Sequence, residues 1–239
     1  MSRSGLCHET DSPWFERMVQ PASGFELIRQ FPLDLVNDRT SKRTFANGQF
    51  MLFTRDAYEA VGGHPRVKDA LLEDLAFAHH MRRPKVNRAV GVLMADGVVR
   101  CRMYRTWDAY RRGWKRIFTE AAGRKPARLR KAAWRLILTG CAMPLVATLA
   151  LVSGIIVLAT KVDPPLGIAL LIAAVLAKMT TLGTLITVYR SQGARVADIA
   201  LYPLGSWHTA SILREAARDL QRGTATSWGG REYAREARS

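Results

Sequence analysis

The chain has 239 residues, of which 36 are Lys or Arg and 20 are Asp or Glu, so its formal net charge is +16. A balance this basic indicates an anionic partner, either nucleic acid or the headgroups of a membrane surface. Its three cysteines, Cys7, Cys101 and Cys141, lie far apart without a C-x-x-C spacing, which argues against both a disulfide framework and a cysteine zinc site.

The first fifty residues predict helices followed by a strand. Apolar residues recur at helical spacing over residues 15–31, and Pro21 and Gly24 divide this stretch into helical pieces. The aromatic, β-prone segment Gln49–Thr54 follows the turn-forming pair Asn47-Gly48 and predicts a strand.

Two short helices and a β-hairpin are predicted next. Arg55–Val61 reads as a helix that the pair Gly62-Gly63 stops, and Ala70–Arg82 reads as a second helix. Two β-prone runs flank an Asp-Gly turn and predict a hairpin, namely Arg88–Met94 and Val98–Met103.

A basic and aromatic helix is predicted over Trp107–Phe118. It combines four aromatic residues with Arg111, Arg112, Lys115 and Arg116. Such a composition is typical of a helix that lies along a membrane surface.

Two long apolar segments predict a transmembrane helical hairpin. Ile137–Ala159 contains no charged residue, and Leu166–Val188 is interrupted only by Lys178. Each exceeds the ~20 residues that a helix needs to cross a bilayer. Basic residues gather before the first segment and after the second, so the positive-inside rule places both ends of the hairpin in the cytoplasm.

A third apolar stretch, Ile199–Leu213, is short and contains Pro203, and we expect it to be interfacial or re-entrant. Lys178 falls near the middle of the membrane, where a charge is costly. It either pairs with another group or a lipid phosphate, or it extends along a tilted helix toward the surface.

One region resembles a known enzyme family. Asn47–His64, which ends in Val-Gly-Gly-His, is followed by Ala70–Ala76, which reads Ala-Leu-Leu-Glu-Asp-Leu-Ala. In order and spacing these segments resemble the acceptor-side half of membrane-bound family 2 glycosyltransferases, and especially those that glycosylate lipids in hopanoid and carotenoid pathways. The resemblance continues through Arg102–Arg105, Arg112–Lys115, the apolar hairpin and Trp228–Tyr233.

The resemblance implies a fold and a division of the chain. Residues 1–131 would be an α/β remnant of a GT-A-type domain, the partial cytoplasmic region on the acceptor side. Residues 132–239 would be the membrane region, with the two spans, the interfacial segment and a basic cytoplasmic tail. The complete enzyme would be a multi-pass protein of the cell inner membrane with its catalytic face in the cytoplasm.

The resemblance also implies a catalytic pair. Asp74 would be the general base that deprotonates the acceptor hydroxyl, with Glu73 beside it, in a single displacement that inverts the sugar carbon. A carboxylate at the start of a helix is suited to accept that proton. Without the resemblance, an exposed Glu-Asp pair that stabilises the helix N-terminus explains the same residues.

Further residues would bind substrate by the same resemblance. Trp114 with Arg111 and Arg112 is similar to a degenerate form of the family's Gln-x-x-Arg-Trp element, from which Gly113 departs. A basic, membrane-facing helix explains them as well. Three glycines, Gly48, Gly62 and Gly63, would let the backbone pass close to a ligand, or they are simply turns.

The donor side of such an enzyme is missing from this sequence. Family members carry an Asp-x-Asp motif that holds a divalent metal and the sugar nucleotide, and no Asp-x-Asp occurs here. We therefore expect no cofactor and no metal ligand in this chain, with Mg²⁺ or Mn²⁺ only in an absent N-terminal half. The expected partners are membrane lipids, a lipid acceptor, a nucleotide sugar in the complete enzyme, and a separately encoded N-terminal half.

Two function classes follow. The first is part of an inverting glycosyltransferase that moves sugar to a membrane lipid and is inactive alone. Such a part either works with a separately encoded N-terminal half or is a truncated remnant. The alternative is a non-catalytic membrane anchor or interaction subunit derived from such an enzyme, which the missing Asp-x-Asp favours. We expect no nucleic-acid partner, because the basic residues lie beside the apolar segments and no nucleic-acid motif is present.

Overall fold

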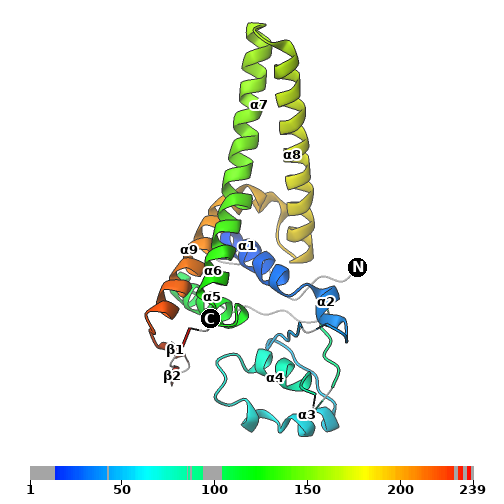
Figure 1. Cartoon of the computed structure of the whole chain (residues 1–239), viewed down its shortest axis with the longest axis vertical. Coiled ribbons are helices and arrows are strands. Elements are labelled where there is room, and N and C mark those ends of the chain that lie inside the picture. Colours follow the sequence, from blue (N-terminus) through cyan, green and yellow to red (C-terminus); the bar gives the residue numbers. More distant parts are fainter. Residues whose placement is uncertain are drawn as a thin grey trace.

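The computed structural model describes residues 14–41, 43–84, 86, 88–93, 104–228, 231–233 and 236–237. Its elements in chain order are α1 (Trp14–Gln30), α2 (Leu33–Asn37), α3 (Arg55–Val61), η1 (His64–Arg66), α4 (Glu73–Met81), α5 (Trp107–Ala121), α6 (Pro126–Ile137), η2 (Leu138–Ala142), α7 (Met143–Thr160), α8 (Pro164–Ser191), η3 (Val196–Leu201), α9 (Tyr202–Gln221), β1 (Thr226–Trp228) and β2 (Arg231–Tyr233). They form three levels along the long axis: the α7–α8 hairpin, a bundle of α1, α5, α6 and α9, and a lower unit with α3 and α4 (Figure 1).

The predicted α/β remnant of a GT-A-type domain is wrong. In the described part of the chain the fold is helical, and its strands are the three-residue pair β1 and β2, which pair antiparallel from Thr226 with Tyr233 to Trp228 with Arg231. A two-stranded ribbon of this length has no face on which to build a layered α/β core.

The strand predicted over Gln49–Thr54 is also not formed. The residues alternate as a strand would, since Phe53 packs on Phe77 with ring centroids 4.9 Å apart whereas Phe50 and Leu52 are 65% and 87% exposed. However, the segment is a turn followed by extended chain that pairs with no described strand. Strand propensity expresses packing against a neighbouring strand, so extended residues without one remain a loop.

The predicted β-hairpin lies largely outside the described residues, which exclude 94–103. The described part of its first arm, residues 88–93, is extended chain without strand pairing. Asn37 holds this arm against α2, because its side chain donates to the Val92 carbonyl at 3.1 Å and accepts from the Val92 N–H at 2.7 Å.

Local helix signals are confirmed where capping residues are present. Thr54 caps the N-terminus of helix α3, since its hydroxyl accepts from the Ala57 N–H, and Gly62 caps the C-terminus with a φ of 90°. The helix predicted from Ala70 begins at Glu73 instead, and the one from Trp107 continues to Ala121. The break expected at Pro21 and Gly24 is wrong, because α1 is continuous through both residues.

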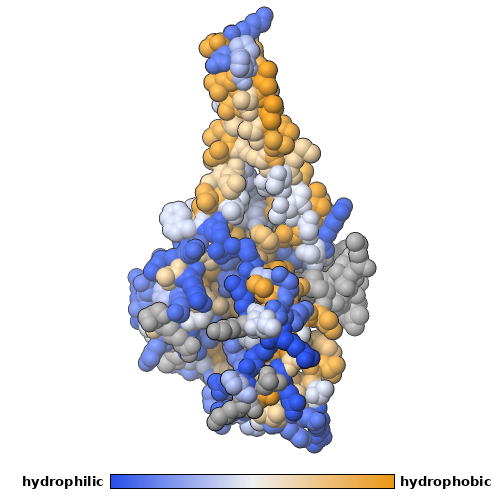
Figure 2. Space-filling view, turned by 45° about the vertical axis from the view of Figure 1, so that its right-hand side comes forward, coloured by the Kyte–Doolittle hydropathy of each residue, from blue (hydrophilic) through white to orange (hydrophobic). Residues whose placement is uncertain are grey.

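The structure contains two helices that are long and apolar enough to cross a membrane, Pro126–Thr160 and Pro164–Ser191. They pack closely where Gly154 and Gly167 face each other, since a Cβ on Gly154 would lie 3.0 Å from the Gly167 carbonyl oxygen. The Lys178 ammonium donates a 2.9 Å hydrogen bond to the Thr148 hydroxyl and so joins the two helices. Figure 2 shows that the surface of the hairpin is hydrophobic.

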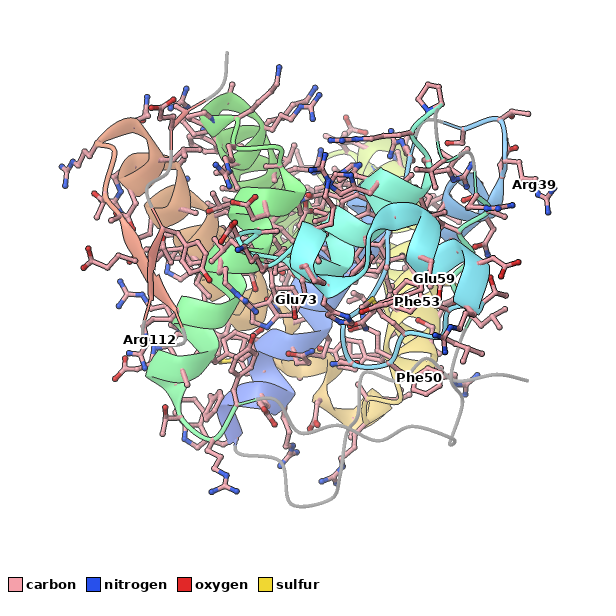
Figure 3. All side chains as sticks on the ribbon, turned by 90° about the horizontal axis from the view of Figure 1, so that it is seen from below. Arg39, Phe50, Phe53, Glu59, Glu73 and Arg112 are labelled. Carbon is pink, nitrogen blue, oxygen red and sulfur yellow. The ribbon has the colours of Figure 1, made fainter. Side chains whose placement is uncertain are left out.

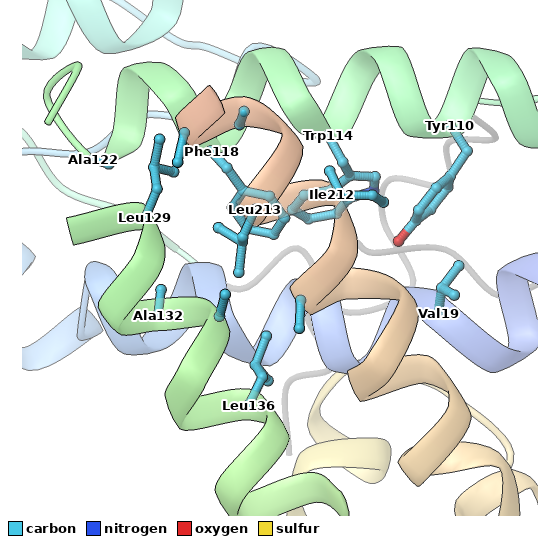
Figure 4. Close-up of a cluster of buried hydrophobic side chains, with 14 of the residues drawn as sticks. Val19, Tyr110, Trp114, Phe118, Ala122, Leu129, Ala132, Leu136, Ile212 and Leu213 are labelled. Atoms are coloured by element: carbon cyan, nitrogen blue, oxygen red, sulfur yellow. The ribbon is translucent and has the colours of Figure 1, made fainter. Parts of the chain in front are cut away.

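Helix α9 is the centre of the bundle below the hairpin. It packs against α1, α5 and α6, and the main hydrophobic cluster draws on all four helices, including Val19, Trp114, Leu129 and Leu213 (Figure 4). The stretch expected to be interfacial or re-entrant therefore forms η3 and the first half of α9. Its buried face belongs to the protein core, and only its outer face is free to meet lipid.

Candidate functional site

The candidate site is built around the carboxylate of Asp74 in the first turn of α4. Its Oδ2 accepts a 2.7 Å hydrogen bond from the backbone N–H of Gly48, and its Oδ1 accepts one of 2.7 Å from the N–H of Leu75. A Cβ on Gly48 would stand 3.1 Å from Oδ2. The close approach of the loop to α4 thus brings together two residues that the sequence singled out.

Burial raises the pKa of Asp74 above the ordinary value for an aspartate, and the neighbouring charge of Glu73 acts in the same direction. The N–H groups of Gly48 and Leu75 and the guanidinium of Arg116 oppose this rise. A carboxylate with a raised pKa binds a proton more tightly than an exposed one. It is therefore a stronger base in its ionised form.

The side chain of Glu73 lines a surface hollow, whereas Asp74 is not among the lining residues. The exposed Glu73 side chain lies next to Lys68 and Arg116 around this hollow of about 600 Å³ below the bundle. The other lining residues are His64, Pro65, Val67, Ala70, Leu71 and Tyr233. Two cations, one carboxylate and two hydrogen-bonding rings around one hollow are suited to a polar, anionic or hydroxylated molecule.

Arg116 is a site residue that the sequence reasoning missed. Its Nη1 donates a 3.0 Å hydrogen bond to the Leu71 carbonyl, two residues before Glu73, and so ties α5 to the start of α4. Sequence gave no signal for it beyond the basic character of the predicted helix, because the contact joins residues 45 positions apart.

Gly62 and Gly63 serve the chain turn after α3. Both have positive φ, 90° and 60°, and a Cβ on Gly63 would lie 2.8 Å from the ring of Tyr58. That ring sits beside His64, and the Tyr58 hydroxyl and His64 Nδ1 are 2.8 Å apart. The two glycines therefore shape the wall of the hollow through His64, and neither lines the hollow itself.

The remaining predicted substrate-binding residues are not brought to Asp74. Trp114 is 2% exposed inside the bundle core, and Arg111 forms a salt bridge of 2.6 Å with Glu215 on α9. Figure 3 shows Arg112 at the edge of the molecule, away from Glu73. Gly113 has a packing role, because a Cβ there would meet the Tyr104 hydroxyl at 2.1 Å.

The described residues contain no group of three or more His, Cys, Asp or Glu side chains that could hold a metal ion. His79 on α4 is engaged with the Thr44 hydroxyl at 2.9 Å. The donor set around Asp74 is made of backbone N–H groups and cations, which suits an anion or a carboxylate and does not suit a cation.

The site lies at the end of the molecule opposite the hairpin. In Figure 1, α3 and α4 are below the bundle, and the bundle separates them from α7 and α8. Helix α6 alone, with 12 residues, is about 18 Å long. A group that reacts at Asp74 must therefore lie well below the base of the hairpin.

Comparison of the chain with protein-family models, with curated protein sequences and with solved structures found no match. The resemblance to family 2 glycosyltransferases therefore depends on the motifs in the sequence alone.

Proposed function

We propose that the chain is the membrane-anchored, acceptor-side part of an inverting glycosyltransferase, with Asp74 as the general base. The observation that carries the proposal is the 2.7 Å hydrogen bond between the Gly48 N–H and Asp74 Oδ2. The resemblance pointed to both residues separately, and their contact supports the proposal that they belong to one site. Asp74 is also half-buried with a raised pKa, as suits a base.

The reaction is a single displacement. Asp74 takes the proton of the acceptor hydroxyl as the hydroxyl oxygen forms a bond to the anomeric carbon of the sugar. The bond between that carbon and the nucleotide diphosphate breaks, and the electron pair leaves with the diphosphate. Glu73, Lys68 and Arg116 in the neighbouring hollow would orient the polar part of a substrate.

The position of Asp74 narrows the acceptor class. The hydroxyl must reach the lower unit, beyond the helical bundle, so a lipid with a large polar headgroup that protrudes from the bilayer fits better than a hydroxyl embedded in the hydrocarbon. The proposed setting is the inner membrane. The excess of basic residues on both flanks of the hairpin supports a cytoplasmic location for the bundle and for Asp74.

A second protein part would supply the donor site. The sequence contains no Asp-x-Asp motif, and in this proposal Mg²⁺ or Mn²⁺ and the sugar nucleotide bind to a separate nucleotide-binding half. The loop that carries Gly48 also exposes Phe50 and Leu52, and Leu93 is 90% exposed. The exposed apolar side chains on the loop that carries Gly48 are where such a half would make contact.

Titration of the purified chain with uridine and guanosine sugar nucleotides in the presence of Mn²⁺ tests whether the donor site lies on a separate protein part. The proposal expects neither micromolar binding nor transfer by the chain alone, and both on addition of a nucleotide-binding half with an Asp-x-Asp motif. Tight binding by the chain alone would contradict it.

A second candidate function is a non-catalytic membrane anchor or interaction subunit. The observation in its favour is that Arg111 and Trp114, which the resemblance assigns to substrate, are engaged in packing and ion pairing with α9. The two functions differ in the role of Asp74, because an anchor works equally well without its carboxylate.

A further inference from the structure

The start of α9 lies level with the base of the hairpin. Cys141 in η2 donates a hydrogen bond of 3.2 Å from its thiol to the Pro203 carbonyl. A Cβ on Gly140 would meet the Ser206 hydroxyl at 2.2 Å, so this turn of η2 lies directly against the first turns of α9. Helices α6 and α9 then run side by side away from the hairpin (Figure 1).

This level corresponds to one face of a bilayer. Between Gly140 and Thr160 the helix rises about 30 Å, which is the thickness of a hydrocarbon core. Below that level the hydrophobic surface of the hairpin gives way to hydrophilic side chains (Figure 2).

Exposed apolar and aromatic side chains lie at the boundary between the hairpin and the bundle. Leu204 and Trp207 on α9 are 55% and 53% exposed at the level of η2, and Trp134 on α6 is 64% exposed below it. Exposed tryptophans at this depth are typical of the interface between hydrocarbon and water. Trp134 lies six residues before Gly140, about 9 Å lower, close to the outer edge of the headgroup layer.

Arg214 sits over the ring of Trp134. Its guanidinium carbon is 4.9 Å from the ring centroid, which is cation–π geometry. The salt bridges within the described part of the chain do not include Arg214. The nearby carboxylates of α9, Glu215 and Asp219, are engaged by Arg111 and Lys115.

More cations surround this pair on the same two helices. Arg130 and Lys131 are exposed on α6 within one turn or so of Trp134, and Arg218 is exposed one turn beyond Arg214 on α9. Their summed positive charge attracts anionic headgroups and gives no advantage to zwitterionic ones.

We propose that Arg214, held over Trp134, binds the phosphate of an anionic phospholipid in the leaflet on the side of the helical bundle. A guanidinium presents five N–H donors, and a phosphate diester can accept two of them. The inference rests on the proposal that the hairpin spans a bilayer, and it is independent of the role of Asp74.

Thermal unfolding of the full chain in neutral detergent micelles tests this site, with phosphatidylglycerol or phosphatidylcholine added in steps. A ligand that binds the folded chain raises the unfolding midpoint. We expect phosphatidylglycerol to raise it and phosphatidylcholine not to. Arg214→Gln should bind phosphatidylglycerol about tenfold more weakly, because a charge-assisted hydrogen bond is lost.

Matched variants separate the site from general charge and from folding. Arg222→Gln removes an exposed arginine at the far end of α9 and should leave the affinity unchanged, and Arg214→Lys should retain most of it. The inference would be overturned if Arg214→Gln and Arg222→Gln lost equal affinity for phosphatidylglycerol. It would also be overturned if the two lipids raised the unfolding midpoint equally. An equal effect of soluble glycerol phosphate would do so too, because it would show a free-phosphate site.

A carbonate wash of membranes that contain the wild-type chain tests the membrane crossing separately from the lipid site. Release of the chain would overturn the membrane crossing and the lipid site together. Retention with no preference for phosphatidylglycerol would overturn the lipid site alone.

Discussion

The backbone N–H of Gly48 donates its hydrogen bond to the same oxygen of Asp74 that a Cβ on Gly48 would approach to 3.1 Å. Residue 48 therefore fixes where the carboxylate stands. The loop and helix α4 are positioned against each other by this contact, and the small size of glycine is what permits it.

Gly48→Ala should reduce sugar transfer about tenfold or more while the chain stays folded, because the carboxylate must move by a few tenths of an ångström and its alignment with the acceptor suffers. Transfer rate and unfolding midpoint are measured together. Gly183→Ala is the matched control, since no heavy atom lies within 4 Å of a Cβ there. Equal activity of the two variants would show that the position of the carboxylate does not matter.

Asp74→Asn should change how the stability of the chain depends on pH. Burial raises the pKa of Asp74, so the protonated carboxyl stabilises the fold. This contribution is fully present below the unfolded pKa of about 3.9 and is lost as the pH rises through the folded pKa. The wild type should therefore lose stability relative to the variant as the pH rises from about 4 toward 7.

Asp38→Asn is the control of opposite sign. Hydrogen bonds from the Thr40 N–H and hydroxyl lower the pKa of Asp38. Its contribution is present above the unfolded pKa and lost as the pH falls through the folded one. Unfolding midpoints between pH 3 and pH 8 check both variants. A wild type that does not lose stability relative to Asp74→Asn between pH 4 and pH 7 would contradict the burial of its charge.

Gly113→Ala should destabilise the bundle by about 1–3 kcal/mol, because the added methyl group overlaps the buried ring of Tyr104. Gly91→Ala is the control, since its nearest neighbour is the Asn37 amide oxygen at 3.8 Å. Denaturant unfolding measures the difference. Similar stability of the two variants would mean that Tyr104 does not pack on α5.

The membrane crossing predicts opposite exposure of the two ends of the hairpin. In a variant whose three cysteines are replaced by serine, a cysteine at Val162 should react in intact cells with a maleimide that does not cross membranes. A cysteine at Arg222 should react only after lysis, because the positive-inside rule places α9 in the cytoplasm. Labelling of position 222 from outside the cell would contradict the predicted cytoplasmic location of α9.

Local signals predicted most of the helices. Helix α3 needs only the Thr54 cap at one end and the left-handed Gly62 at the other, and the hairpin helices need only length and hydrophobicity. These properties depend on neighbours in the sequence, so reading the sequence recovers them.

Local signals of this kind wrongly predicted a strand over residues 49–54. Residues 49–54 alternate as a strand does, but a strand requires a partner, and the described residues supply none. The contacts of Trp114 and Arg111 could not be predicted for a related reason, because helix α9 packs against them from about one hundred residues away in the sequence. By contrast, the pairing of Gly48 with Asp74 joins two motifs that the resemblance had already located.

The most direct test of Asp74 as the base is the rate of sugar transfer to extracted membrane lipid by the chain together with a nucleotide-binding half. Asp74→Asn keeps the shape of the side chain but cannot accept the proton, so the rate should fall by roughly 10² to 10⁴. Glu73→Gln, compared at equal expression and equal membrane insertion, should lose much less, because Glu73 lines the adjacent hollow. Full activity of Asp74→Asn would contradict the proposed function and would favour an anchor without catalysis.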